Sequence, residues 1–198
     1  MNKVKKVSMT MFGLLMLPLL FACSNTQSQG VEAIKAKGKL VVAINPEFAP
    51  FEYQKLVDGK NQIVGSDVEL AKAIAKELGV EVEFSPMSFD NVLASLDSGK
   101  ADLAISGVSK TEERSQVYDF SIPYYTSKNK VIVRKSELTN YQSVKDLAQK
   151  KVGAQKGYIQ ETLAKETLQN ASLVSLPTNG NLITDLKSGQ LDDLIFEE

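Results

Sequence analysis

Apolar positions along this chain alternate between continuous runs and a spacing of three or four residues. Residues 40–44 are all apolar, which is typical of a strand buried in a parallel sheet. From Asp67 to Leu78 the apolar residues follow a helical period, with Ser66 placed to cap the helix and Gly79 to end it. Because this alternation continues along the sequence, it predicts a mostly parallel α/β fold.

The same pattern gives the remaining elements and their order. Residues 58–61 (DGKN) predict a turn between two short extended segments. Helices are predicted at 31–37, 67–78, 90–96, 158–168 and 182–186. Strands are predicted at 40–44, 80–84, 103–105, 131–133, 152–154, 173–176 and 194–196. Residues 118–125 interrupt this alternation, so we predict lobe 1 at 31–126 and lobe 2 at 127–198.

A short motif occurs twice, 90 residues apart. Its first copy is Leu96, Ser98, Gly99, Asp102 and Ile105, and its second copy is Leu186, Ser188, Gly189, Asp192 and Ile195. Each copy predicts an amphipathic helix, a glycine that ends it, and an aspartate before a short buried strand. Two lobes of similar build would enclose a cleft for a small molecule, whereas chance similarity between βα units is the alternative.

The first 22 residues predict a secretory signal peptide, with three lysines before an apolar run. The only cysteine, Cys23, follows a segment that resembles a bacterial lipobox, so we expect Cys23 to be lipidated. A plain signal peptide or an uncleaved anchor is the alternative. The polar residues 23–30 predict a flexible tether. The protein is therefore expected on the extracytoplasmic side of the cell membrane, held there by a lipid.

The composition of the chain excludes several kinds of binding and catalysis. The net charge is −1, so the chain has no excess of basic residues that would indicate binding to nucleic acid. The chain has no histidine and its one cysteine lies at the signal, so most metal and nucleophile chemistry is absent. We expect no metal, no cofactor and no catalytic residue, and a monomer.

The segment from Ser106 to Arg114 is the richest in candidate binding groups. Ligands of open α/β sheets bind beyond the carboxyl ends of the strands, where this segment is predicted to lie. Ser106, Gly107 and Ser109 offer hydroxyls and free backbone N–H groups. Arg114, one turn into a helix that Thr111 can cap, is suited to a bidentate grip on a carboxylate. The alternative is an exposed arginine paired with a neighbouring glutamate.

Two aromatic residues and one acid are further candidates. Phe48 and Phe89 are predicted in loops, where two rings across a cleft can hold an apolar stem or a planar cation. The alternative for both is a place in the core. Glu197, at the end of the last predicted strand, can accept an ammonium group, or it is simply a solvated acid.

Five segments, taken in order, resemble the polar amino-acid solute-binding proteins of ABC importers, bacterial extracellular solute-binding proteins of family 3. They are NPEFAPFE (45–52), G-x-D (65–67), L-x-S-G-K-A-D (96–102), S-x-x-S-x-T-x-x-R (106–114) and F-S-x-P-Y-Y (120–125). The resemblance covers residues 38–198 and implies a two-lobed fold of the type II periplasmic-binding-protein kind. The same fold core forms the ligand-binding domains of ionotropic glutamate receptors, so a channel-like label would not imply a channel.

The resemblance also implies roles. Arg114 would clamp the α-carboxylate of a free amino acid, with backbone amides at Ser109, Ile159 and Gln160. The α-ammonium would meet Ser106, the carbonyl of Gly107, the hydroxyl of Ser109, and Glu197. The ligand side chain would lie against Phe48 and Phe89, tuned by Asn45 and Gln155.

The expected function is delivery of an amino acid to an ABC permease and its ATPase. Glu47, Glu197 and the aromatic rings favour a cationic ligand such as arginine, lysine or histidine, whereas Asn45 weakens that preference. Glutamine or glutamate is the next choice. A cyclohexadienyl dehydratase-like enzyme and a surface lipoprotein without a transport role are two further hypotheses. Family members run further, so we expect this chain to be truncated before its return to lobe 1, with Asp193 where a small apolar residue is usual.

Overall fold

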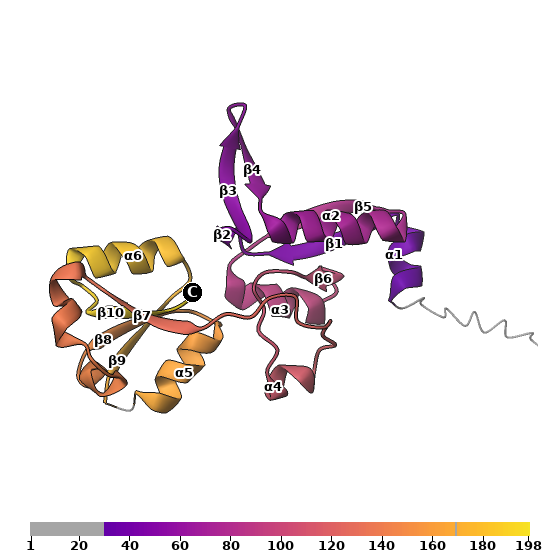
Figure 1. The fold of residues 1–198 in the computed structure, drawn as a ribbon. Helices are drawn as coiled ribbons and strands as arrows, with labels where there is room; N and C mark the ends of the chain where they lie inside the picture. Colours follow the sequence, from indigo (N-terminus) through magenta and orange to yellow (C-terminus); the bar gives the residue numbers. More distant parts are fainter. Residues whose placement is uncertain (1–29, 169) are drawn as a thin grey trace, which may run out of the picture.

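The computed structural model describes residues 30–168 and 170–198 (Figure 1). The predicted signal peptide, the predicted lipidation site Cys23 and residues 23–29 of the predicted tether lie outside the described residues. Among the helices that are described, none has the length and apolarity needed to cross a membrane.

The first lobe contains two small sheets. Its elements are α1 (Val31–Lys37), β1 (Lys39–Ile44), β2 (Glu47–Phe48), β3 (Glu52–Val57), β4 (Lys60–Val64), α2 (Ser66–Leu78), β5 (Glu81–Pro86), α3 (Phe89–Asp97), β6 (Leu103–Ala104) and α4 (Glu112–Ser115). The main sheet is parallel, in the order β5-β1-β6. Strands β2, β3 and β4 form an antiparallel sheet whose β3–β4 hairpin projects from the lobe (Figure 1).

The second lobe has one four-stranded sheet in the order β7-β10-β8-β9, in which only β7 is antiparallel to its neighbour. Its elements are β7 (Asn129–Val133), the 3-10 helices η1 (Lys135–Asn140) and η2 (Val144–Leu147), β8 (Lys151–Gln155), α5 (Ile159–Thr167), β9 (Ser172–Leu176), α6 (Asn179–Ser188) and β10 (Asp193–Glu197). Residues 116–128 pass between the lobes without a helix or strand.

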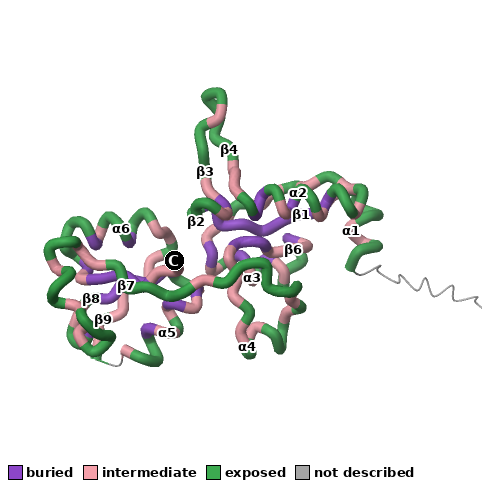
Figure 2. The backbone as a smooth tube through the Cα atoms, in the orientation of Figure 1, coloured by how far each residue is buried: buried purple, intermediate pink, exposed green. Residues whose placement is uncertain are grey.

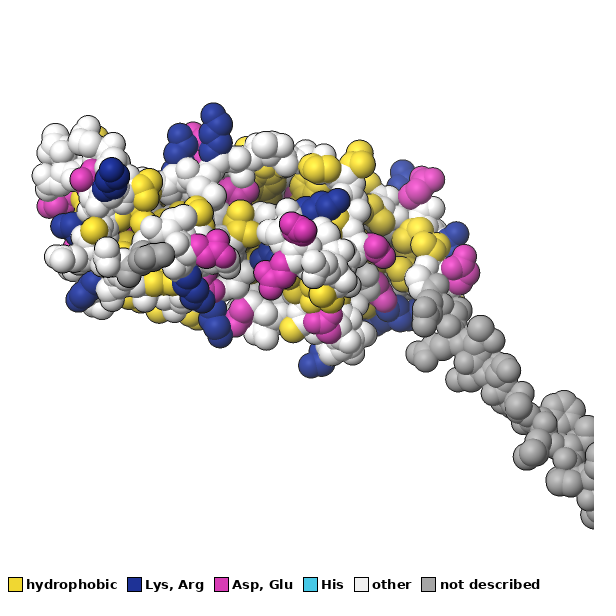
Figure 3. All heavy atoms as spheres, turned by 90° about the horizontal axis from the view of Figure 1, so that it is seen from below, with side chains coloured by type: hydrophobic (Ala, Val, Ile, Leu, Met, Phe, Trp, Pro, Cys, Tyr) yellow, Lys and Arg dark blue, Asp and Glu magenta, His cyan; other side chains and the backbone are white. Residues whose placement is uncertain are grey.

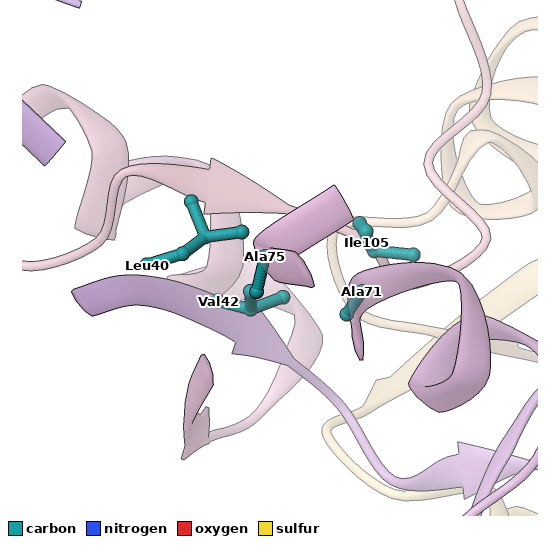
Figure 4. Close-up of a cluster of buried hydrophobic side chains, with 5 residues drawn as sticks. All are labelled: Leu40, Val42, Ala71, Ala75 and Ile105. Atoms are coloured by element: carbon teal, nitrogen blue, oxygen red, sulfur yellow. The ribbon is translucent and has the colours of Figure 1, made fainter. Parts of the chain in front are cut away.

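The continuous apolar run of β1 is explained by helices on both faces of its sheet. Successive side chains of a strand point to opposite faces. Leu40 and Val42 pack with Ala71 and Ala75 of α2 and with Ile105 (Figure 4). Alternate residues of β1 pack on α3 instead, in a cluster of Val41, Ala43, Val92 and Ala101. Figure 2 shows the buried residues gathered along β1 and along the strands of the second lobe.

The second lobe has matching layers. One cluster joins Leu147, Val152, Ala164 and Ile195 on the α5 face, and another joins Leu182, Leu186, Leu191 and Leu194 on the α6 face. Outside these cores, acidic and basic side chains are interspersed on the face seen in Figure 3, in keeping with a net charge of −1.

The predicted helices and strands are confirmed, with shifted ends. The prediction that Ser66 caps α2 was wrong, because Ser66 is the first residue of the helix. Gly65 is at the cap position, and no side-chain hydrogen bond caps the helix there. Gly65 has φ 134°, and a Cβ there would collide with the backbone carbonyl of Phe51. This close approach lets Asp67 N–H donate to the Phe51 carbonyl at 2.9 Å, so the backbone of the preceding loop replaces a side-chain cap.

Candidate functional site

The two lobes contact each other at the carboxyl ends of their central parallel strands. Asn45 directly follows β1, and its side-chain oxygen accepts a hydrogen bond from Gln155 at the end of β8, at 3.2 Å. Glu47 accepts the backbone N–H of Asn179 in α6 at 2.8 Å. Arg114 donates to the carbonyl of Gly157 at 2.9 Å. These contacts join strand ends of both sheets, which is where ligands of α/β folds bind.

A pocket of about 330 Å³ opens between the lobes and the segment that joins them. This volume lies at the lower end of the range of small-molecule sites. Residues from both lobes and from the joining segment line it: Phe48, Phe51, Gly107, Val108, Ser109, Lys110, Phe120, Ser121, Ile122, Pro123, Tyr124, Tyr125, Thr126, Ser127, Asn129, Ile159 and Glu197. The structure thus brings Phe48, Gly107, Ser109, Ile159 and Glu197 of the predicted set to one cavity.

Arg114 lies beside this pocket and is held by backbone oxygens. Thr111 caps the short α4 helix by accepting the N–H of Arg114 at 3.1 Å. The guanidinium donates to the carbonyls of Ser109 and Gly157, both at 2.9 Å. Among the described residues Arg114 makes no salt bridge, so the alternative of pairing with a neighbouring glutamate is wrong. Burial lowers the pKa of Arg114, and a carboxylate would compensate that buried charge.

Ser106 and Gly107 have different places. The hydroxyl of Ser106 accepts the N–H of Asn45 at 2.8 Å and donates to Glu52 at 3.0 Å, so it is fully buried beneath the pocket. Gly107 lines the pocket with φ 56°, and an added Cβ would lie 3.0 Å from the ring of Phe48. Glycine at 107 therefore allows the ring of Phe48 to pack on the loop.

The carboxylate of Glu197 has a hydrogen-bond donor for only one of its two oxygens among the described residues. One of its carboxylate oxygens accepts a hydrogen bond from Ser127, and the other, Oε2, is buried without a partner among the described residues. The residue lines the main pocket and an adjoining cavity of about 20 Å³ beside Gln155, Tyr158 and Gln160. A buried carboxylate oxygen without a donor is unfavourable, so Glu197 is suited to receive a cationic group.

The aromatic walls differ from the predicted pair. Phe48 packs on Phe51 with 5.0 Å between ring centroids, and Phe51 meets the edge of Tyr125 at 4.7 Å. Phe89 is only 2% exposed and stacks on Tyr158 at 3.4 Å, between the lobes and outside the main pocket. A place in the core is therefore the interpretation of Phe89 that fits. Phe51 and Tyr125 were missed as wall residues, although both lie within the motifs NPEFAPFE and F-S-x-P-Y-Y.

Three amides of the predicted set are buried at the interface between the lobes. Asn45 also donates to the carbonyl of Met87 at 2.9 Å, and Gln155 donates to that of Pro177 at 3.1 Å. Gln160 donates to Asn129 at 2.8 Å. Each amide thus has a protein partner, which fixes its orientation around the cavity.

Sequence reasoning missed two buried acids, Glu52 in β3 and Asp67 in α2. Burial, and next the charge of Asp67, raise the pKa of Glu52 to about 9, so Glu52 is protonated at neutral pH. Burial also raises the pKa of Asp67. No group of three or more histidine, cysteine, aspartate or glutamate side chains in residues 30–168 and 170–198 is arranged to hold a metal ion.

Comparison with known proteins identifies the family. The profile of the bacterial extracellular solute-binding proteins, family 3, matches residues 40–172. The chain belongs to this family. It is 39% identical over 181 residues to a Bacillus subtilis protein named "Arginine-binding extracellular protein ArtP", covering 90% of this chain and 68% of that protein.

Solved structures show the same fold. The crystal structure of an amino acid ABC transporter substrate-binding protein from Streptococcus pneumoniae, bound to L-arginine, is 82% identical in sequence to this chain and superposes on it with a TM-score of 0.83. The match covers 84% of this chain and 70% of that one. An ancestral amino-acid-binding protein described as a precursor of cyclohexadienyl dehydratase is 35% identical with a TM-score of 0.79, over 84% of this chain and 73% of that one. The fold is thus that of the type II periplasmic binding proteins.

Proposed function

We propose that this chain binds free L-arginine in the cleft between its lobes and delivers it to the permease and ATPase of an ABC importer. The observation that carries the proposal is the buried, unpartnered oxygen of Glu197, among the described residues, in a pocket with aromatic walls. A guanidinium or ammonium group supplies the donors that this oxygen lacks, and its plane can lie on Phe48 or Phe51. The 82% identical relative is bound to L-arginine and the 39% identical relative is named for binding arginine, which supports the same ligand here.

The opposite end of the ligand would meet Arg114. In the structure the Arg114 guanidinium donates to two carbonyl oxygens, which are weaker partners than a carboxylate. An α-carboxylate would replace the Gly157 carbonyl and add the backbone N–H groups of Ser109, Ile159 and Gln160. The α-ammonium would then lie toward the Gly107 carbonyl and Glu197. No bond is made or broken, so the proposed role is binding and not catalysis.

Closure would couple binding to transport. The proposed ligand contacts come from both lobes, so the closed arrangement is stabilised only when both grip the same molecule. We further propose that lipidation at Cys23 and the tether keep the monomeric protein on the outer side of the cell membrane, close to the permease.

Calorimetric titration of the purified chain with each of the twenty amino acids tests the ligand. Arginine should bind most tightly, and glutamine and glutamate at least about tenfold more weakly, since their α-ammonium can reach Glu197 but their side chains carry no cation to lie on Phe48 or Phe51. Glu197→Gln should weaken arginine binding by about tenfold or more. Glu198→Gln, an exposed neighbour, is the matched control and should bind as the parent does. Equal or tighter binding of glutamine or glutamate would overturn the cationic preference.

A further inference from the structure

Glu52 and Asp67 form a buried carboxyl pair outside the pocket. Glu52 is fully buried at the start of β3, and Asp67 is 1% exposed in the first turn of α2. Glu52 Oε2 and Asp67 Oδ1 are each buried without a hydrogen-bond partner among the described residues, and neither carboxyl group is in a salt bridge there. Two buried carboxylates without a cation repel each other, whereas one proton would supply the donor that both free oxygens lack, so we expect the pair to hold one proton.

The remaining oxygens of the pair are anchored to the binding loop and to the pocket wall. Glu52 Oε1 accepts from the Ser106 hydroxyl at 3.0 Å, and that hydroxyl accepts the N–H of Asn45 at 2.8 Å. Asp67 accepts through Oδ2 from the Tyr124 hydroxyl at 2.9 Å. These hydrogen bonds connect Glu52 to the end of β1 and the loop after β6, and Asp67 to the segment between the lobes.

We propose that Glu52 and Asp67 are positioning residues, which share one proton and so hold the Ser106–Ser109 loop and Tyr124 in the geometry that receives the ligand. The proposal rests on the proposed function, because the loop matters through the amino acid it would bind. Neither carboxyl lines the main pocket, so both act through the groups they hold.

The surroundings of the pair keep the proton in place. Asp67 on α2, Tyr124 on the joining segment, Glu197 on β10 and Tyr158 before α5 are the titratable groups that face Glu52. All four are acids, and no cation is among the groups that act on the pKa of Glu52, which is raised to about 9. Once this proton is lost, two adjacent carboxylates repel each other in a buried site, and the loop they hold loses its anchor.

The test compares arginine affinity at pH 7 and pH 10 for the parent chain and Glu52→Gln. Glutamine keeps a donor for Asp67 and an acceptor for Ser106 but cannot ionise. Glu52→Gln should therefore bind arginine within about threefold of the parent at pH 7, and at least about fivefold more tightly than the parent at pH 10. Titration of the ligand ammonium affects both proteins alike and cancels in their ratio. Glu81→Gln, exposed on β5, is the control and should follow the parent at both pH values.

An infrared difference spectrum reads the proton without any ligand. The parent minus Glu52→Gln spectrum at pH 7 should contain the carbonyl band of a protonated carboxyl group, and the parent minus Glu81→Gln spectrum should lack it. If arginine binds but the band is absent or the affinity ratio stays constant with pH, the positioning role is refuted. If the band is present but no amino acid binds at any pH, the proposed function fails, and the positioning role fails with it while the shared proton stands.

Discussion

The two copies of the helix–glycine–aspartate–strand motif fold alike but have different surroundings. In the first lobe, Asp102 N–H donates to the carbonyl of Val41 at 2.9 Å, and its side chain accepts the Val41 N–H at 2.8 Å. In the second lobe, Asp192 makes the same two bonds with Lys151, also at 2.9 and 2.8 Å. Each aspartate thus joins its strand to the neighbouring central strand, which confirms the repeated unit predicted from the sequence.

The strands that follow these aspartates differ. Strand β6 has two residues and pairs with β1 alone, whereas β10 has five and pairs on both sides with β7 and β8. A pocket of about 370 Å³ with many apolar side chains lies beside β6. The motif therefore determines how a strand begins, while the neighbouring strands determine how far it continues.

The residue after each aspartate also differs. Leu103 follows Asp102, but Asp193 follows Asp192 and is fully buried with both oxygens unpartnered among the described residues. Burial, and next the charge of Asp192, raise the pKa of Asp193 to about 7. The buried Asp193 of the second copy therefore destabilises the folded chain, whereas Leu103 at the matching position of the first copy does not.

Replacing that acid should give the largest change in stability. In the unfolded chain Asp193 loses its proton near its ordinary pKa, while in the folded chain it keeps the proton until about pH 7. Its contribution to stability is therefore full at low pH and falls as the pH rises toward about 7, at up to about 1.4 kcal/mol per pH unit. Asp193→Ala should stabilise the chain by about 2 to 3 kcal/mol at pH 8, measured by urea unfolding.

The gain from Asp193→Ala should shrink toward pH 4, where the acid is protonated in the folded chain and partly protonated in the unfolded chain. Asp119→Ala, at an exposed position, is the control and should change stability by less than about 0.5 kcal/mol. A gain that is the same at both pH values would show that ionisation of Asp193 is not its source.

Removing the shared anchor tests the equivalence of the two copies. Asp102→Ala and Asp192→Ala each leave one backbone N–H without its acceptor, so each should cost about 1 to 3 kcal/mol. In urea unfolding the loss should be smaller for Asp192→Ala, because this variant also removes the charge that raises the pKa of Asp193, whereas Asp102→Ala also removes the ion pair with Lys37. A loss confined to one lobe would mean that the copies share a sequence but not a structural role.

Disturbing the contact between the lobes at Gly157 should give the next largest effect. Gly157 has φ 84°, and an added Cβ would lie 3.0 Å from Cα of Asp90 in the other lobe. Gly157→Ala should therefore resist closure and weaken arginine binding by about tenfold, or about 1.4 kcal/mol, measured by calorimetry. Gly180→Ala, in α6 with open space around it, is the control. Unchanged affinity in Gly157→Ala would show that ligand binding does not need this contact.

Removing the ion pairs of Asp102 and Asp192 should give the smallest changes in stability. Lys37 contacts Asp102 at 2.6 Å on the surface, so Lys37→Met should cost less than about 1 kcal/mol. Arg134, beside Asp192, also donates to the carbonyls of Leu186 and Leu191, so Arg134→Met should cost more. Urea unfolding at low and high salt measures both losses, and only that of Lys37→Met should vanish at high salt. The reverse order would contradict the difference described between the two copies.

The fold was predictable because its signals are local. The continuous run of β1 and the period of α2 follow from a few neighbouring residues. Residues at or beyond strand ends, such as Ser109 and Glu197, were predicted to lie at one edge of the sheets, and both line the pocket.

Features that depend on distant partners were not predictable. The residues near Glu52 in the sequence do not indicate that Asp67 and Ser106 will lie beside it. An acidic residue is also usually exposed, so the sequence alone predicts an exposed Glu52. Phe89 was predicted to lie in the pocket wall, but it stacks on Tyr158 of the other lobe, a partner that the neighbouring sequence does not reveal. Such contacts are products of the tertiary fold and leave no periodic signal.

The central claim is that arginine bridges Arg114 in one lobe and Glu197 in the other. A crystal structure of this chain grown with L-arginine tests it most directly. We predict arginine in the cleft, with its α-carboxylate on the Arg114 guanidinium in place of the Gly157 carbonyl and a cationic group on Glu197. A crystal in which Arg114 still donates to Gly157, with no arginine between the lobes, would contradict it.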